Sequence, residues 1–474
     1  MLFNSLTFVV FFALVWGGYR LLPGWGARKT WLLVASYVFY GAWNPPFALL
    51  LLLSTVVDWL VAKRMDAAQQ PGPRKAWLLI SLVVNLGMLG FFKYGDFLLA
   101  NTSALLALAG IHYQAPSLGI LLPVGISFYT FQTLSYTIDV YRRELKPEPS
   151  LRDFALFVSF FPQLVAGPIV RARDFLYQLV TPPAPQPGRM AWGLFLMTLG
   201  LFEKTVVADT LLAPSAETVF GHPFPLHAVD AWLGVIAFAF QILFDFGGYS
   251  LTAIGAALCF GFHLNDNFRF PYASVGFSDF WRRWHISLST WLRDYLYIPL
   301  GGNRGGKLRT GLNLMVVMVL GGLWHGAAWT FVIWGTLHGL LLLAERGVRR
   351  LCGGAAWASS SPAMFAGWLL TFIGVCLTWV FFRAPDLPQA MKNLVSMLGV
   401  FGAEGDQVLS TLQIVEVASV ATVVLVMHRL LRDTTLEAAV VRVPTWLLGV
   451  VWALMGGAIL LTQADGSAFI YFQF

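Results

Sequence analysis

Long apolar runs separated by short polar segments are the dominant pattern of this chain. A helix crosses the hydrocarbon core of a bilayer with about 20 predominantly apolar residues. The pattern therefore predicts an all-α polytopic membrane protein with about 11 spans. The clearest runs cover residues 6–22, 30–44, 46–62, 76–92, 191–212, 230–246, 311–340, 363–382, 408–428 and 445–462.

Two further apolar stretches, 117–138 and 152–170, are less regular because proline and glycine interrupt them. Such segments are tolerated at membrane depth where protein or a cavity shields the backbone, which predicts broken or re-entrant helices. Ordinary helices that kink at proline are the alternative. The interrupting residues are Pro123, Gly125, Pro162, Gly167 and Pro168.

Composition agrees with a membrane protein. Of the 474 residues, 57% are hydrophobic and only 12% are charged, which is too little charge to cover a water-soluble surface. The net charge of +7 comes from basic residues in short loops, so it indicates topology and no nucleic-acid partner. The three cysteines have no C-x-x-C spacing, so neither a disulfide framework nor a metal site is expected.

Lysine and arginine in short loops predict the orientation. The basic loop 63–75 and the pair Arg429 and Arg432 are expected on the cytoplasmic side. Counting spans outward from these loops places both the N-terminus and the C-terminus on the periplasmic side.

Residues 262–310 are rich in charge, aromatic residues and glycine, and their excess of arginine predicts a cytoplasmic location. Within this segment, tryptophan and leucine recur at helical spacing opposite arginine and serine, which predicts one amphipathic helix at the membrane interface. His285 falls at the seam between the two faces. A lone histidine there is either an ordinary interfacial residue or part of a site. The faces are defined by Trp284 and Trp291 on one side and Arg282 and Arg293 on the other.

The glycine-rich stretch that follows contains Arg304, Lys307 and Arg309. Free backbone N–H groups beside guanidinium groups suit phosphate oxygens. A flexible basic connection between spans is the alternative, and the spacing matches no known phosphate loop.

His325 lies about a dozen residues into the run 311–340, flanked by glycine and alanine that allow other groups to approach. A histidine at that depth is a candidate functional residue. The alternative is a core histidine that hydrogen-bonds a neighbouring helix.

Six stretches carry a recognisable set of motifs: 121–142, 161–171, 244–250, 280–306, 321–339 and the terminal 469–474. Together they resemble the membrane-bound O-acyltransferase (MBOAT) family, and within it the bacterial branch of alginate and cellulose O-acetyltransferases and D-alanyl transferases. One departure is Gly247, where many relatives are expected to have serine.

The resemblance implies an MBOAT-type helical bundle around a central funnel, formed by a single transmembrane domain over 1–474. It implies that 262–310 is a cytoplasmic interfacial catalytic segment and that 311–340 is a core helix with the active-site histidine. His325 would be the catalytic base and His285 the second catalytic residue, with no metal. The candidate donor-binding residues are Arg282, Arg283, Trp284, Trp291, Arg293, Asp294, Tyr297, Asn303, Arg304, Lys307 and Trp324.

The implied activity is transfer of an acetyl group from a cytoplasmic thioester to an exopolysaccharide of alginate or cellulose type. The donor would be acetyl-CoA or an acyl-phosphopantetheine carrier, as a substrate and not a bound cofactor. Transfer would be direct or through a periplasmic acetyltransferase partner of a polysaccharide synthase complex at the bacterial inner membrane. The alternatives are a D-alanyl or other acyl transferase, a transporter or flippase, and a structural scaffold.

Overall fold

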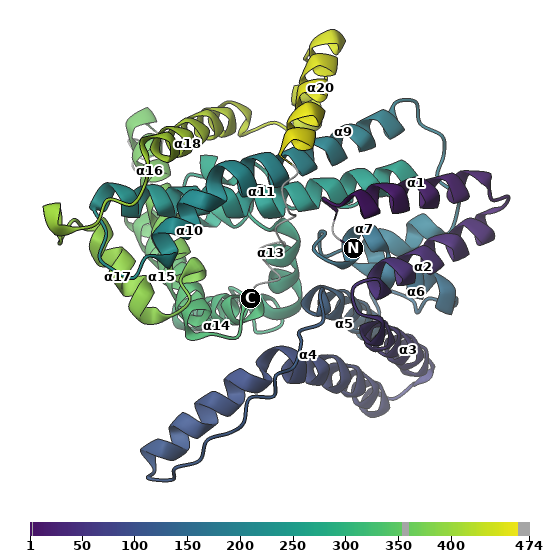
Figure 1. Cartoon of the computed structure of the whole chain (residues 1–474). Coiled ribbons are helices and arrows are strands. Elements are labelled where there is room, and N and C mark those ends of the chain that lie inside the picture. The colour runs from purple at the N-terminus through teal and green to yellow at the C-terminus, as the bar shows by residue number, and fades with distance from the viewer. Residues whose placement is uncertain (2, 353–359, 463–474) are drawn as a thin grey trace. The chain divides into compact units, whose positions relative to one another are not determined.

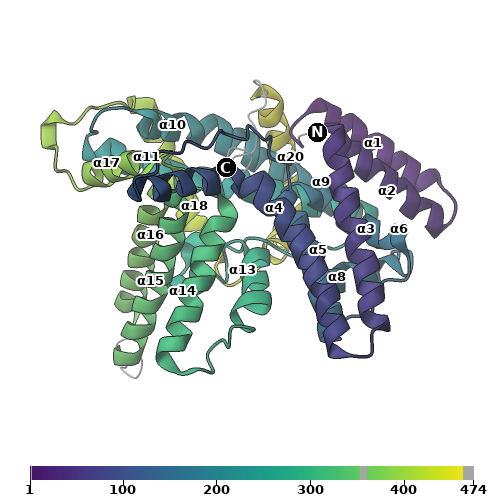
Figure 2. The same ribbon diagram turned by 90° about the horizontal axis from the view of Figure 1, so that it is seen from below.

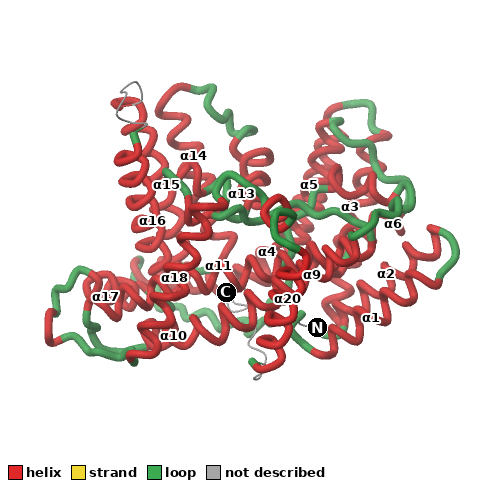
Figure 3. The backbone as a smooth tube through the Cα atoms, turned by 90° about the horizontal axis from the view of Figure 1, so that it is seen from above, coloured by secondary structure: helices red, strands yellow, loops and turns green. Residues whose placement is uncertain are grey.

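The computed structural model describes residues 1, 3–352 and 360–462. Throughout these residues the regular structure is helical, and no strand is formed (Figure 3). The chain divides into two compact units, the first comprising Met1–Leu194 and Ala253–Asn265 and the second Phe195–Thr252 and Asp266–Phe474. Two helices, α9 (Arg189–Phe202) and α11 (Ala228–Phe260), contribute residues to both units.

The first unit contains a layer of long helices in which α3, α4 and α5 lie side by side (Figure 1). A buried polar cluster joins two of them, because Ser81 Oγ and Asn85 Nδ2 donate to the Asp58 carboxylate at 2.6 and 2.9 Å. Polar groups between membrane helices are satisfied by one another in this way. The helices are α1 (Leu6–Leu21), α2 (Trp25–Gly41), α3 (Pro45–Ala67), α4 (Pro71–Leu108), α5 (Ile126–Arg142), α6 (Leu151–Ser159), α7 (Phe161–Leu164), α8 (Ala172–Phe175) and η1 (Leu176–Leu179).

The two irregular apolar stretches are interrupted at the positions that proline and glycine indicate. Helix α5 begins only after Gly125, whose φ of +76° and close approach to the Leu164 carbonyl oxygen leave no room for a side chain. Helix α6 ends at Ser159, and a single turn, α7, precedes the non-helical residues 165–171. The prediction of broken helices is confirmed, and the alternative of continuous helices that kink at proline is not.

The second unit carries both candidate histidines. Its helices α14, α15 and α16 pack side by side (Figure 2). Its elements are η2 (Glu203–Leu212), α10 (Ala213–Gly221), η3 (Pro271–Ala273), α12 (Phe277–Phe280), α13 (Ile286–Leu292), η4 (Arg293–Tyr297), α14 (Gly306–His325), α15 (Trp329–Cys352), α16 (Ser361–Arg383), α17 (Leu387–Met397), η6 (Gly402–Glu404), α18 (Thr411–Leu431), α19 (Leu436–Val440) and α20 (Thr445–Leu461).

The apolar run 311–340 is not one core helix, and that prediction was wrong. Helix α14 ends at His325, the backbone is extended at Gly326, and α15 returns from Trp329. The two helices touch at glycines: a Cβ on Gly322 would lie 2.2 Å from the Phe331 carbonyl oxygen, and one on Gly335 would lie 2.3 Å from the Met318 carbonyl oxygen. The glycines therefore allow a close helical hairpin, and they place His325 at a helix end.

We expect Gly322→Ala to destabilise this hairpin by about 1–3 kcal/mol, because the added methyl group would overlap a backbone carbonyl. Thermal unfolding of the purified protein in detergent measures the change. Gly311→Ala on the same helix is the control, since its Cβ would make an ordinary 3.6 Å contact with Leu343. Equal unfolding temperatures for the two variants would contradict the close-contact explanation.

The prediction of one amphipathic helix within 262–310 was also wrong. Helices α12 and α13 are separated by a turn at residues 281–285, and α13 continues as the π-helical segment η4. The reason is a backbone pairing with an upstream extended segment: Arg269 N–H donates to the Arg283 carbonyl, and Ile286 N–H donates to the Asn267 carbonyl, each at 2.9 Å. The two faces inferred from a continuous helix therefore do not exist.

The fold class is confirmed as a polytopic helical membrane protein. Among the described residues, seven helices are long and apolar enough to cross a membrane, and Leu6–Leu21 and Thr445–Leu461 are shorter apolar helices. The count of about 11 spans, the single domain, the central funnel and the orientation of the termini stay predictions. The C-terminus and the terminal motif 469–474 lie outside the described residues. The seven helices cover Pro45–Ala67, Pro71–Leu108, Arg189–Gly221, Ala228–Phe260, Trp329–Cys352, Ser361–Arg383 and Thr411–Leu431.

Candidate active site

His285 and His325 meet in the interior of the second unit. Their ring centroids are 6.2 Å apart, and the two residues are 0% and 3% exposed. They come from different elements, since His285 precedes α13 and His325 ends α14. The structure thus brings together the two histidines that the sequence singles out.

His285 adopts an unusual backbone conformation. Its φ of +42° lies in the left-handed region, which is uncommon for a residue other than glycine. The pairing with Asn267 and Arg269 on one side and the start of α13 on the other hold it there. Strained conformations of this kind persist where surrounding contacts impose them, and they concentrate at functional sites.

Asn267 determines which ring nitrogen of His285 carries the proton. The Ser287 N–H and the Ser287 hydroxyl both donate to Asn267 Oδ1, at 3.4 and 2.9 Å. A backbone N–H can only donate, so the atom facing it is the amide oxygen. His285 Nδ1 lies 3.1 Å from that same oxygen and is therefore the protonated nitrogen.

The second nitrogen of His285, Nε2, is consequently an acceptor in the neutral ring. Among the described residues none forms a hydrogen bond with it, although it is fully shielded from solvent. The Asn267 amide is fixed in turn, because its Nδ2 donates to Ser250 Oγ of α11 at 3.2 Å. A buried imidazole with an available lone pair can accept a proton or a hydrogen bond.

Aromatic rings enclose the histidine pair. Phe246 lies 4.7 Å from His285 between ring centroids, and Trp324 packs against both histidines at 5.7 and 5.1 Å. Trp334 and Phe382 contact His325 at 5.0 and 5.2 Å. This enclosure excludes water from the two imidazoles, which suits chemistry on a hydrolysable donor.

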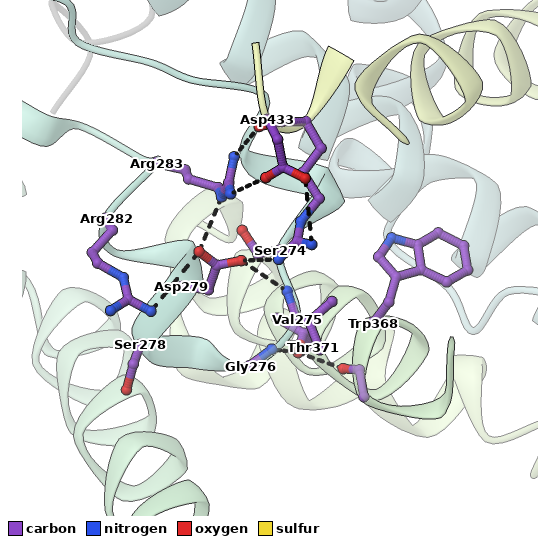
Figure 4. Close-up of polar contacts among 12 residues, drawn as sticks. Ser274, Val275, Gly276, Ser278, Asp279, Arg282, Arg283, Trp368, Thr371 and Asp433 are labelled. Carbon is purple, nitrogen blue, oxygen red and sulfur yellow. Dashed lines mark hydrogen bonds and ion pairs between the residues drawn. The ribbon is translucent and has the colours of Figure 1, made fainter. Parts of the chain in front are cut away.

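The arginines next to His285 are held by a carboxylate. Asp279 accepts from Arg283 Nε at 3.0 Å and from the Val275 N–H at 3.1 Å (Figure 4). It also accepts from Arg432 Nη2 at 3.0 Å. Burial alone would raise the pKa of the Asp279 carboxyl, but the hydrogen bonds from Arg432, Val275 and Arg283 together lower it. Asp279 therefore holds one side of the Arg283 guanidinium group in place. Arg282 approaches Asp279 only to 3.9 Å and is largely exposed.

We expect Asp279→Asn to destabilise the protein by about 2 kcal/mol, because it removes charged acceptors from two arginines. The lowered pKa means that the carboxylate stabilises the fold fully above its unfolded-state pKa of about 4. That contribution disappears as the pH falls through the folded-state pKa.

Thermal unfolding between pH 7 and pH 3 measures both effects. The wild type should lose stability more steeply than Asp279→Asn at the acidic end. Asp266→Asn is the control, since its 3.7 Å contact with Arg269 joins two well-exposed groups. Parallel pH profiles for wild type and Asp279→Asn would contradict the assignment.

The other candidate donor-binding residues fall into three groups: buried aromatic residues, residues in local polar pairs, and exposed cations of the glycine-rich loop. Trp284 and Trp291 are buried, and Trp284 stacks on Phe280 at 5.6 Å. Arg293 pairs with its neighbour Asp294, and Tyr297 donates to Asn303 Oδ1 at 2.7 Å. Their role toward a donor stays a prediction.

Arg304 and Lys307 in the glycine-rich loop are exposed and make no ion pair with any described residue. The loop itself is anchored, because Asn313 Nδ2 donates to the Gly302 carbonyl at 3.1 Å. Among the candidates, Trp324 packs against both histidines. A binding role for the loop cations also stays a prediction.

Sequence reasoning missed the groups that surround the histidines. Phe246 and Trp334 lie within the matched stretches 244–250 and 321–339, but nothing in those stretches marks them as site residues. Asn267 and Phe382 lie outside the matched stretches, and no spacing distinguishes them. A Cβ on Gly247 would lie 3.8 Å from Glu203 Oε2, so the serine expected there would fit in this fold.

Known proteins are similar to this chain over most of its length. The model of the membrane-bound O-acyltransferase family matches residues 126–382, which include both histidines. A probable alginate O-acetylase, AlgI, from Azotobacter vinelandii is 43% identical over 87% of this chain and 80% of its own length.

Two other relatives differ in their acceptor. A peptidoglycan O-acetyltransferase of Helicobacter pylori is 38% identical over 85% of this chain and 80% of its own length. A teichoic acid D-alanyltransferase of Bacillus subtilis is 28% identical over 46% of this chain and 58% of its own length. The chain belongs to the membrane-bound O-acyltransferase family and is an O-acyltransferase.

Proposed function

We propose that this protein transfers an acetyl group from a cytoplasmic thioester donor, acetyl-CoA or an acyl-phosphopantetheine carrier, to a hydroxyl of a cell-surface polysaccharide. The observation that carries the proposal is the enclosed pair of His285 and His325. The O-acetylating relatives match over most of the chain, whereas the D-alanylating relative matches less than half of it. This difference favours acetyl over D-alanyl transfer.

The chemistry requires one proton acceptor and a site without bulk water. The acceptor hydroxyl gives its proton to an imidazole while its oxygen attacks the thioester carbonyl carbon. The tetrahedral intermediate then expels the thiolate, which takes up the proton, so the products are an ester and a free thiol. We assign His325 as the base.

His285 has three candidate roles: to orient the donor, to donate to the oxyanion, or to activate His325. The hydrogen bond from Nδ1 to Asn267 counts against donation to the oxyanion, because the remaining nitrogen, Nε2, accepts and does not donate in the neutral ring. The other two roles use Nε2 as an acceptor and are compatible with this tautomer.

The acceptor is proposed from the relatives. They act on alginate and peptidoglycan, so a uronate or amino-sugar polymer is the expected acceptor class. Cellulose is the alternative polymer for the same reaction. Delivery through a periplasmic acetyltransferase of a polysaccharide synthase complex is the proposed route, with direct transfer as the alternative. Membership of an acyltransferase family counts against the transporter and scaffold hypotheses.

The test is acetyl transfer by the purified protein in proteoliposomes supplied with isotopically labelled acetyl-CoA. Alginate oligomers, peptidoglycan fragments and cellulose oligomers are offered separately, each with and without a periplasmic extract. Labelled ester on one acceptor supports the proposal and identifies the polymer. Label from a D-alanyl carrier, with none from acetyl-CoA, would overturn the acetyl assignment.

A further inference from the structure

A positively charged pocket lies at the end of α18, where the chain turns through α19 toward α20. Its volume is about 500 Å³, within the range of sites for small molecules. Four guanidinium groups and one carboxylate contribute to its wall. The lining residues are Arg269, Arg283, Arg432, Asp433, Thr434, Thr435, Ala438 and Arg442.

Two of these arginines keep their guanidinium donors available. Arg442 makes no ion pair with any described residue. Arg269 has only its 3.7 Å contact with Asp266 and is about half exposed. Arg283 and Arg432 are different, because Asp279 already accepts from both guanidinium groups, each at 3.0 Å, and Arg432 Nε is shielded from solvent.

The carboxylate in the wall neutralises the pocket only in part. Asp433 lies 3.5 Å from Arg283 and 4.0 Å from Arg432, and it does not pair with Arg442 or Arg269. The pocket therefore presents spare guanidinium donors to an anion. Forked guanidinium groups suit the oxygens of a phosphate.

Exposed apolar residues lie next to the lining residues 432–442 in the sequence. Leu430, Val441 and Trp446 are 76%, 79% and 71% exposed. On membrane helices such side chains face lipid, and tryptophan at a helix end marks the level of the headgroups. The basic pocket thus opens where lipid-facing helices begin and end.

We propose that this pocket binds the phosphate of an anionic phospholipid headgroup through Arg269 and Arg442. Basic pockets between membrane helices recognise anionic headgroups in this manner. The exposed apolar residues beside the pocket supply a surface for the acyl chains, which a water-soluble phosphate donor would not use. The inference does not depend on the proposed acyl transfer.

Bound lipid should also stabilise the segment that holds His285 in place. Arg269 donates its backbone N–H to Arg283, and two residues earlier Asn267 holds His285. A ligand that binds only the folded state raises its stability by mass action. Phospholipid in this pocket should therefore raise the unfolding temperature.

The experiment uses the full chain in nanodiscs of phosphatidylcholine with increasing phosphatidylglycerol. Native mass spectrometry counts retained phosphatidylglycerol, and thermal unfolding measures its effect. Arg442→Gln and Arg269→Gln should each weaken retention about fivefold and remove most of the thermal gain. Arg350→Gln, an exposed change at the end of α15 outside the pocket, should behave as wild type.

Two results would overturn the proposal. One is equal retention of phosphatidylglycerol by wild type and by both pocket variants. The other is stabilisation that depends on the pocket arginines and is produced by coenzyme A but not by phosphatidylglycerol, which would make the pocket a site for donor phosphates. Since neither readout uses catalysis, failure here is distinct from failure of acyl transfer.

Discussion

Replacing His325 with alanine should lower the rate of acetyl transfer by about 100- to 10,000-fold, the usual contribution of a positioned general base. His325 is nearly fully buried, is enclosed by Trp334 and Phe382, and faces the second histidine at 6.2 Å. Alanine removes the only proton acceptor that we assign to the acceptor hydroxyl. Initial rates with labelled acetyl-CoA in proteoliposomes measure the loss.

The matched control for this prediction is His428→Ala. His428 is also buried in the second unit, but it packs on Phe270 and Tyr272, away from the histidine pair. We expect it to retain most activity after correction for folded protein. If His325→Ala keeps wild-type rates while folded, His325 is not the base.

Asn267→Leu should lower kcat by about 10- to 1,000-fold while the KM for the donor stays close to wild type. Leucine fills similar space but cannot accept the proton of His285 Nδ1, so the ring loses the hydrogen bond that fixes its tautomer. In the serine protease triad, disturbing the corresponding orientation of a catalytic histidine has a large effect on kcat. Asn267 is a positioning residue because it acts through His285.

Asn267→Asp separates this role from a merely structural one. Aspartate still accepts from His285 Nδ1 and from Ser287, so it should restore a large part of the activity. Matching losses in the leucine and aspartate variants, with both proteins folded, would indicate that the side chain serves only packing.

The sequence predicted the helical membrane class because long apolar runs report directly on span formation. It also predicted the breaks near Gly125 and Pro162, since these residues restrict the backbone locally. It did not predict the hairpin of α14 and α15. The run 311–340 is apolar throughout, and the turn at Gly326 depends on the packing of Gly322 against α15, which is a tertiary contact.

The candidate site, like the fold, was predicted only in part from the sequence. His285 and His325 stand out because of their apolar surroundings and the matched motifs. Asn267 does not, because its importance arises from a backbone pairing between residues 14 and 19 positions apart and from a hydrogen bond to a histidine in a left-handed conformation. Helical periodicity across 280–300 instead suggested a single helix, which that same pairing prevents.

The most direct test of the central claim, that the two histidines form one acyl-transfer site, is the rate of the double variant His285→Ala/His325→Ala beside the two single variants. Groups that act as a unit have strongly non-additive effects. We predict that the double variant is no slower than the slower single variant. If the two losses multiply, the histidines act independently and the account of a shared site is wrong.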